Sequence, residues 1–208
     1  MNKLFILLMV MVVTLVTSVV MADPNGEAKE GRLFLFQKCN DTLKHTTGYD
    51  SSGCPTSGNG PWPIFFGNDR YGRMDYNLWG PRFTFIFVGK RLEPRNNYTL
   101  IYYPDDWPGD GLICLGSGRS TKSGNILIKG NKDIGTSLPA PFDANFNPNP
   151  PSGAVGAKIW LVLADDVDCG GNGTTSKMKA WNPTSYLLEY NLIVYERRPK
   201  TVEQDEED

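Results

Sequence analysis

Hydrophobic residues alternate with polar ones in several short segments that are separated by turn-forming residues. In residues 73–79, Met74, Tyr76 and Leu78 share one face and the other face is polar, which is typical of a half-buried β-strand. Residues 82–88 carry apolar side chains on both faces, which predicts a central strand that is covered on both sides. The pattern predicts further strands at residues 31–38, 98–103, 112–115, 125–129, 158–163 and 186–196.

This series of segments predicts an all-β fold. Outside residues 1–22, no long segment shows the period of an amphipathic helix, and turns containing Gly or Pro separate the strands. We therefore expect an antiparallel β-sandwich, similar to a jelly roll, with seven or eight strands and long disulfide-tied loops. A single domain is expected at 31–200, after a flexible segment at 23–30 and before an acidic tail at 201–208.

The first 22 residues have the pattern of a secretory signal peptide. Lys3 supplies the positive charge, an apolar run extends from Leu4 to Met21, and Ala22 ends a small-residue cleavage site. The alternative is an uncleaved N-terminal anchor, because the run is just long enough to span a bilayer. Under both alternatives, residues 23–208 are expected outside the cytoplasm, at the cell surface or secreted, with no further membrane span.

The four cysteines of the chain form an even set, and even sets in exported proteins usually pair. They allow three connectivities, and we favour Cys39–Cys54 together with Cys114–Cys169. The first bond closes a polar loop and the second joins two strand ends. A zinc site of four cysteines is disfavoured because no C-x-x-C pair is present.

Three glycosylation sequons point in the same direction as the cysteines. They begin at Asn40, Asn97 and Asn172, and each has Thr at its third position. We therefore expect a glycoprotein, although such triplets also arise by chance.

Composition and charge exclude several classes of function. His45 is the only histidine, which excludes a metal site built on two histidines and the H-E-x-x-H motif of zinc proteases. The net charge is −2 and no basic stripe is present, so nucleic acid is not an expected partner. No G-x-S-x-G motif or phosphate-binding glycine loop occurs in the chain.

Three sequence blocks resemble a family of exported proteins found in archaea and some bacteria. The blocks are YTLIYYPDDWPGDGLICLGSG from Tyr98, GAKIWLVLADDVDC from Gly156 and WNPTSYLLEYNLIVYE from Trp181, and GRMDYNLWGPRFTFIFVGKRLEP upstream also fits. The resemblance covers about residues 72–196. It implies secretion and a β-sandwich, and it implies no activity.

Calcium is the metal that the loops favour. Ca²⁺ takes six to eight oxygen ligands, and loops rich in Asp supply them. Asp residues also stabilise turns through their own backbone, which explains such loops without a metal. The candidate ligands are Asp165, Asp166 and Asp168 in one loop and Asp105, Asp106 and Asp110 in another. A third run, Asp143, Asn145 and Asn147, has the initial spacing of an EF-hand loop but lacks its Gly and Glu.

Carbohydrate is the alternative ligand. Exposed aromatic rings stack on sugar faces, and Trp62 and Trp107 lie in loops flanked by proline, where exposure is expected. Trp79, Trp160 and Trp181 lie on or beside strands and are expected in the core.

A secreted hydrolase is the third hypothesis. Glycoside hydrolysis needs two carboxyl groups that face each other across a cleft. Asp75, Asp105, Asp106, Glu93 and Glu189 are candidates, but no spacing selects a pair, and Glu189 is expected to face outward.

The leading hypothesis is a non-catalytic structural or adhesive protein of the cell exterior. Its expected partners are other surface proteins, a second copy of itself through Ca²⁺ at the Asp loops, or strand addition at exposed sheet edges. The alternatives are a lectin-like module and, third, the hydrolase.

Overall fold

The computed structural model describes residues 29–56, 70–147, 155–171 and 173–199. The predicted signal peptide, the acidic tail, Trp62 and Asn172 lie outside these described residues.

The described residues form an all-β fold with antiparallel sheets, as predicted. Seven strands have six or more residues: β1 (Glu30–Phe36), β2 (Tyr71–Asn77), β4 (Phe83–Lys90), β5 (Asn97–Tyr103), β6 (Ile113–Arg119), β7 (Ile126–Lys132) and β8 (Lys158–Leu163). Five have two residues: β3 (Trp79–Gly80), β9 (Val167–Asp168), β10 (Lys177–Met178), β11 (Leu188–Glu189) and β12 (Glu196–Arg197). The seven long strands match the predicted number, and the short pairings that no periodicity can reveal raise the total to twelve in this part of the chain.

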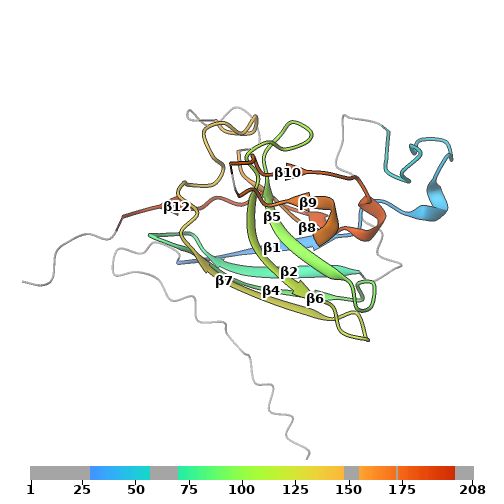
Figure 1. Cartoon of the computed structure of the whole chain (residues 1–208), viewed down its shortest axis with the longest axis horizontal. Helices are drawn as coiled ribbons and strands as arrows, with labels where there is room; N and C mark the ends of the chain where they lie inside the picture. The colour runs from blue at the N-terminus through green and yellow to red at the C-terminus, as the bar shows by residue number, and fades with distance from the viewer. Residues whose placement is uncertain (1–28, 57–69, 148–154, 172, 200–208) are drawn as a thin grey trace, which may run out of the picture.

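Two sheets face each other across the main core (Figure 1). The larger has the strand order β11-β1-β2-β4-β7, and the smaller has the order β6-β5-β8. The chain after β8 contains the short 3-10 helices η3 (Ala164–Asp166) and η4 (Pro183–Ser185). This segment covers the outer face of the smaller sheet, where it builds a second core on Ile101, Trp160 and Val162. The described residues therefore form three layers, and none of them forms a layer over the outer face of the larger sheet.

The alternation in β2 and β4 of the larger sheet places the rings of Tyr76, Phe83, Phe85 and Phe87 in the core. Met74 and Tyr76 of β2 are buried, as the pattern over 73–79 predicts. Phe85 is directly opposite Gly130 of the neighbouring strand, and a Cβ on Gly130 would lie 2.1 Å from the Phe85 ring. The glycine thus leaves the space that the ring occupies.

The prediction that residues 82–88 are covered on both sides is wrong for one face. The strand β4 is central in its sheet, between β2 and β7. However, Ile86 is 47% exposed and Val88 is only partly buried, because nothing among the described residues packs on the outer face of the sheet. A strand pattern shows which residues share a face but not whether a second layer covers it.

The predicted strand at 186–196 is also wrong as a single element. Leu187 bridges to β8 in the smaller sheet, whereas Leu188 and Glu189 pair with β1 in the larger sheet. Tyr195 bridges to Leu138, and the following residues form β12. The segment therefore runs along the edge between the layers, and its apolar residues enter both cores.

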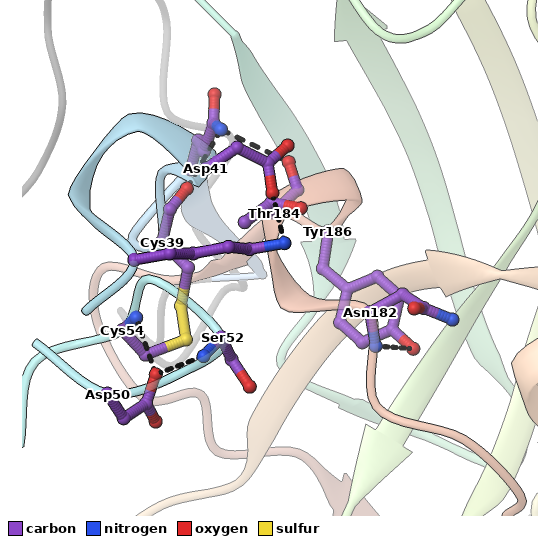
Figure 2. Close-up of a disulfide and its surroundings, with 10 residues drawn as sticks. Cys39, Asp41, Asp50, Ser52, Cys54, Asn182, Thr184 and Tyr186 are labelled. Carbon is purple, nitrogen blue, oxygen red and sulfur yellow. Dashed lines mark hydrogen bonds and ion pairs between the residues drawn. A yellow bond between two sulfur atoms is a disulfide. The ribbon is translucent and has the colours of Figure 1, made fainter.

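Both predicted disulfides are present. Cys39–Cys54 closes the loop that contains η1 (Asp41–Leu43), and Asp50 caps this loop by accepting hydrogen bonds from the backbone N–H groups of Ser52 and Cys54. Figure 2 shows this loop beside the segment that carries Thr184. Two disulfides indicate folding in an oxidising environment.

The described part of the chain has no helix that is long and apolar enough to cross a membrane.

Candidate functional site

The most chemically distinctive hollow of the described surface lies at the connection between β5 and β6. It is an open depression of about 480 Å³ with both aromatic and acidic side chains on its walls. Its lining includes Asp105, Asp106, Trp107, Asp110 and Phe142. We call these five residues the Trp107 site.

The backbone around the Trp107 site is held by hydrogen bonds to neighbouring segments. The N–H of Gly109 donates to the carbonyl of Asp106 at 2.6 Å, which closes a tight turn. The N–H of Met178 donates to the carbonyl of Pro108, and the N–H of Gly111 donates to the carbonyl of Ser176. The loop is therefore fixed to the C-terminal layer rather than projecting freely.

Asp105 anchors the loop to the smaller sheet. Its carboxylate pairs with the ammonium group of Lys158 on β8 and accepts a hydrogen bond of 2.6 Å from the Asn145 side chain. Asp143 is buried and accepts hydrogen bonds from the Tyr102 hydroxyl and from the Asn145 backbone. The run that resembles the start of an EF-hand thus serves to hold this loop.

Trp107 is exposed, and its ring is supported from below. The side chain is 54% exposed, and its ring meets the edge of Trp181 with 5.8 Å between the ring centroids. Trp181 in turn contacts Trp160, which stacks on Tyr103 at 3.9 Å. This aromatic series connects the exposed ring to the second core, so the ring is available to a ligand without reorganisation of the loop.

Asp106 and Asp110 give the site a negative potential. Both are exposed, and within the described residues neither side chain forms a hydrogen bond or ion pair. Burial raises the pKa of the Tyr103 hydroxyl, and the charges of Asp105 and Asp106 raise this pKa further. The two free carboxylates can accept hydrogen bonds from ligand hydroxyl or amino groups.

The second Asp loop is structural. Asp166 is buried; one oxygen accepts a hydrogen bond of 2.6 Å from the Tyr186 hydroxyl, and both oxygens accept from the Asn182 amide. Asp168 caps a turn by accepting from the N–H of Gly170. Of the residues predicted in this loop, Asp165 is the exposed one.

The calcium hypothesis gains no support from these positions. Within the described ranges, no three His, Cys, Asp or Glu side chains are grouped so that they could hold a metal ion. One carboxylate oxygen of Asp105 and both carboxylate oxygens of Asp166 are engaged by protein donors. The two loops have separate roles. The loop with Asp106 and Asp110 lines the Trp107 site, and the loop with Asp166 stabilises the fold.

Replacing Asp166 by Ala should destabilise the fold by about 3 kcal/mol, because the buried Tyr186 hydroxyl and the Asn182 amide lose a charged acceptor. Urea denaturation measures this loss as a lower midpoint at an unchanged slope. Asp165→Ala is the matched control, since its exposed side chain should change the free energy of unfolding by less than about 0.5 kcal/mol. Equal effects of the two substitutions would show that the Asp166 carboxylate is not structural.

The remaining carboxylates proposed for hydrolysis form ion pairs or hydrogen bonds with other side chains. Glu189 was expected to face outward, but its side chain is only 16% exposed, pairs with Lys38 and accepts a hydrogen bond from the Trp160 indole. Glu93 accepts from Ser185, and Asp75 pairs with two arginines of the larger sheet. These three carboxylates are therefore engaged by other side chains, and none of them lines the Trp107 site.

Two of the three predicted glycosylation sites lie among the described residues. Asn40 accepts hydrogen bonds from the backbone and hydroxyl of Thr42, and Asn97 is exposed at the start of β5. Sequence reasoning did not find Phe142, which is 57% exposed in the Trp107 site. An aromatic residue in an otherwise polar, proline-rich segment was the signal available for it.

No family model, curated protein or solved structure matches the chain.

Proposed function

We propose that this chain is an exported, non-catalytic adhesive protein that binds carbohydrate at the Trp107 site. The observation that carries the proposal is an exposed, well-supported indole beside two carboxylates that have no side-chain partner among the described residues. The indole offers a flat apolar face to a sugar ring, and the carboxylates accept hydrogen bonds from its hydroxyl groups.

The charge of the site defines the class of sugar. Asp105, Asp106 and Asp110 all line the depression, so an acidic sugar would be repelled. A neutral or amino sugar fits this potential. The signal-like N-terminus and the two disulfides support export of the protein. Neutral and amino sugars are found outside the cell, where an exported protein would meet them.

We do not propose self-association through Ca²⁺. Among the described residues the Asp loops bring no three ligands together, and Asp166 is engaged within the fold. Binding at the Trp107 site is therefore expected to persist in the presence of a chelator.

Trp107→Ala should weaken sugar binding by about 30-fold, because a central aromatic contact is commonly worth about 2 kcal/mol. The measurement is a glycan array with the exported protein, followed by calorimetric titration of the best neutral or amino sugar. Tyr190→Ala is the matched control, since Tyr190 is 62% exposed but does not line the depression. A silent array, or equal binding by the Trp107→Ala protein, would remove the carbohydrate proposal.

A further inference from the structure

No layer of described residues covers the outer face of the larger sheet, and this face combines apolar with basic side chains. The strand register places Phe34, Arg73, Val88 and Leu127 in one row across β1, β2, β4 and β7. Phe34, Ile86 and Leu127 are 36%, 47% and 57% exposed. Val88, Leu127 and Ile86 adjoin one another, and exposed apolar side chains gathered on one face often mark an interaction site.

The charges of this face are unbalanced. The adjoining row places Arg32, Asp75, Ile86 and Lys129 side by side. Asp75 is shared by Arg32 at 2.6 Å and by Arg73 at 3.2 Å. Neither Lys90 nor Lys129 forms an ion pair with a described residue. The face is therefore basic although the whole chain has a net charge of −2.

Two hollows lie at opposite ends of β2 and β4 on this face. The hollow at one end has a volume of about 200 Å³ and is lined by Tyr71, Arg73, Val88 and Lys90. The hollow at the other end has a volume of about 380 Å³, and its lining includes Trp79 and Ile86 together with Lys29, Glu30 and Asp75. The Arg198 guanidinium lies over the Trp79 ring, 4.9 Å from its centroid, and adds a positive charge at this end. The strand between them has seven residues and is roughly 20 Å long, which suits an extended chain rather than a small ion.

We propose that this face binds an acidic polysaccharide laid along β2 and β4. Its carboxylates pair with Arg73 and Lys90 in the basic hollow, and its ring faces pack on Ile86 and on Trp79 in the other hollow. The occupant follows from the charge complementarity of the basic hollow and from the spacing of the two hollows along the sheet.

The positions of the charges on this face disfavour a bilayer or a second copy of the chain as the occupant. Its apolar side chains stand in the same rows as Arg73 and Lys129, so a bilayer could not bury them without burying the charges. A second copy in face-to-face packing would bring the two sets of basic side chains together. Neither alternative explains a basic hollow and an aromatic hollow on one path.

The binding test uses the full exported protein and polygalacturonate as the probe. We expect the protein to bind this polymer, and binding should weaken steeply as NaCl screens the charges. Neutralising the basic hollow with Arg73→Gln and Lys90→Gln should weaken binding at least about tenfold. The matched control is Lys122→Gln with Lys177→Gln, which changes the net charge equally at exposed positions away from this face.

The proposal would be overturned if the protein does not bind polygalacturonate, if binding does not depend on salt, or if the control variant loses as much binding. Two further results would assign the face to another occupant and so overturn it as well. One is preferred binding to vesicles of phosphatidylserine and phosphatidylcholine, and the other is self-association in sedimentation that the Arg73 and Lys90 substitutions abolish. Trp107→Ala should leave polygalacturonate binding unchanged, because Trp107 lies on the other side of the sandwich, with the C-terminal layer. The proposal and the sugar site can therefore fail independently.

Discussion

Removing the Cys114–Cys169 disulfide with serine at both positions should lower the free energy of unfolding by about 4 kcal/mol. The bond joins residues 55 apart in sequence, and in the chain-entropy account a loop of that length restricts the unfolded chain by this amount. For a chain of this size the melting temperature should fall by roughly 8–16 °C. Differential scanning calorimetry of the oxidised protein and the double variant measures both quantities.

The position of the Cys114–Cys169 bond predicts which part of the fold loses stability. Cys114 lies on β6 and Cys169 directly follows β9, so the bond attaches the C-terminal layer to the smaller sheet. This layer supplies Trp181, which supports the ring of Trp107. Sugar binding at the Trp107 site should therefore weaken in the double variant at temperatures where the fold persists.

The other disulfide is the control for this prediction. Cys39–Cys54 closes a loop of 15 residues whose helix η1 has no buried residue. Its removal should cost about 3 kcal/mol and leave sugar binding unchanged. A larger effect of this variant, on either stability or binding, would contradict the role assigned to the Cys114–Cys169 bond.

The parts of the fold that the sequence predicts are those encoded by local alternation. The pattern over residues 73–79 identifies the buried face of β2 at Met74 and Tyr76, although the strand is Tyr71–Asn77, and residues 158–163 coincide with β8. The disulfide pairing could be favoured because each bond closes a simple connection between predicted elements. Local pattern and global fold agree at these positions.

The errors arise where a side chain's role depends on distant partners. The apolar residues at 186–196 look like one strand, yet they divide between two sheets and two cores. Ile86 looks like a core residue because strand patterns contain no information about a missing layer. That missing layer is what makes the outer face a candidate binding surface.

The candidate site was predicted in part. Trp107 was expected to be exposed from its proline neighbours, and it is. The two Asp loops look alike in sequence, but Asp166 is buried against Tyr186 whereas Asp106 is exposed. The difference lies in contacts with residues far along the chain, which a single sequence does not display.

The second large effect is expected at the contact between Phe85 and Gly130. Phe85 is 2% exposed in the main core, so Phe85→Ala should cost about 3–5 kcal/mol through lost burial and a residual cavity. Gly130→Ala alone should cost about 1–3 kcal/mol, because the new Cβ would overlap the Phe85 ring. Urea denaturation of both single variants gives these values.

The double variant distinguishes overlap from a general sensitivity of the core. Once Phe85 is Ala, the Cβ at position 130 meets no ring, fills part of the cavity and reduces the freedom of the unfolded chain. Gly130→Ala should therefore be neutral or stabilising in this background, which gives a coupling energy of about 1–3 kcal/mol. In a Phe83→Ala background the Phe85 ring remains and Gly130→Ala should be as costly as in the natural chain. Additive losses in the Phe85→Ala background would mean that the glycine is required for the strand itself and not for the ring that covers it.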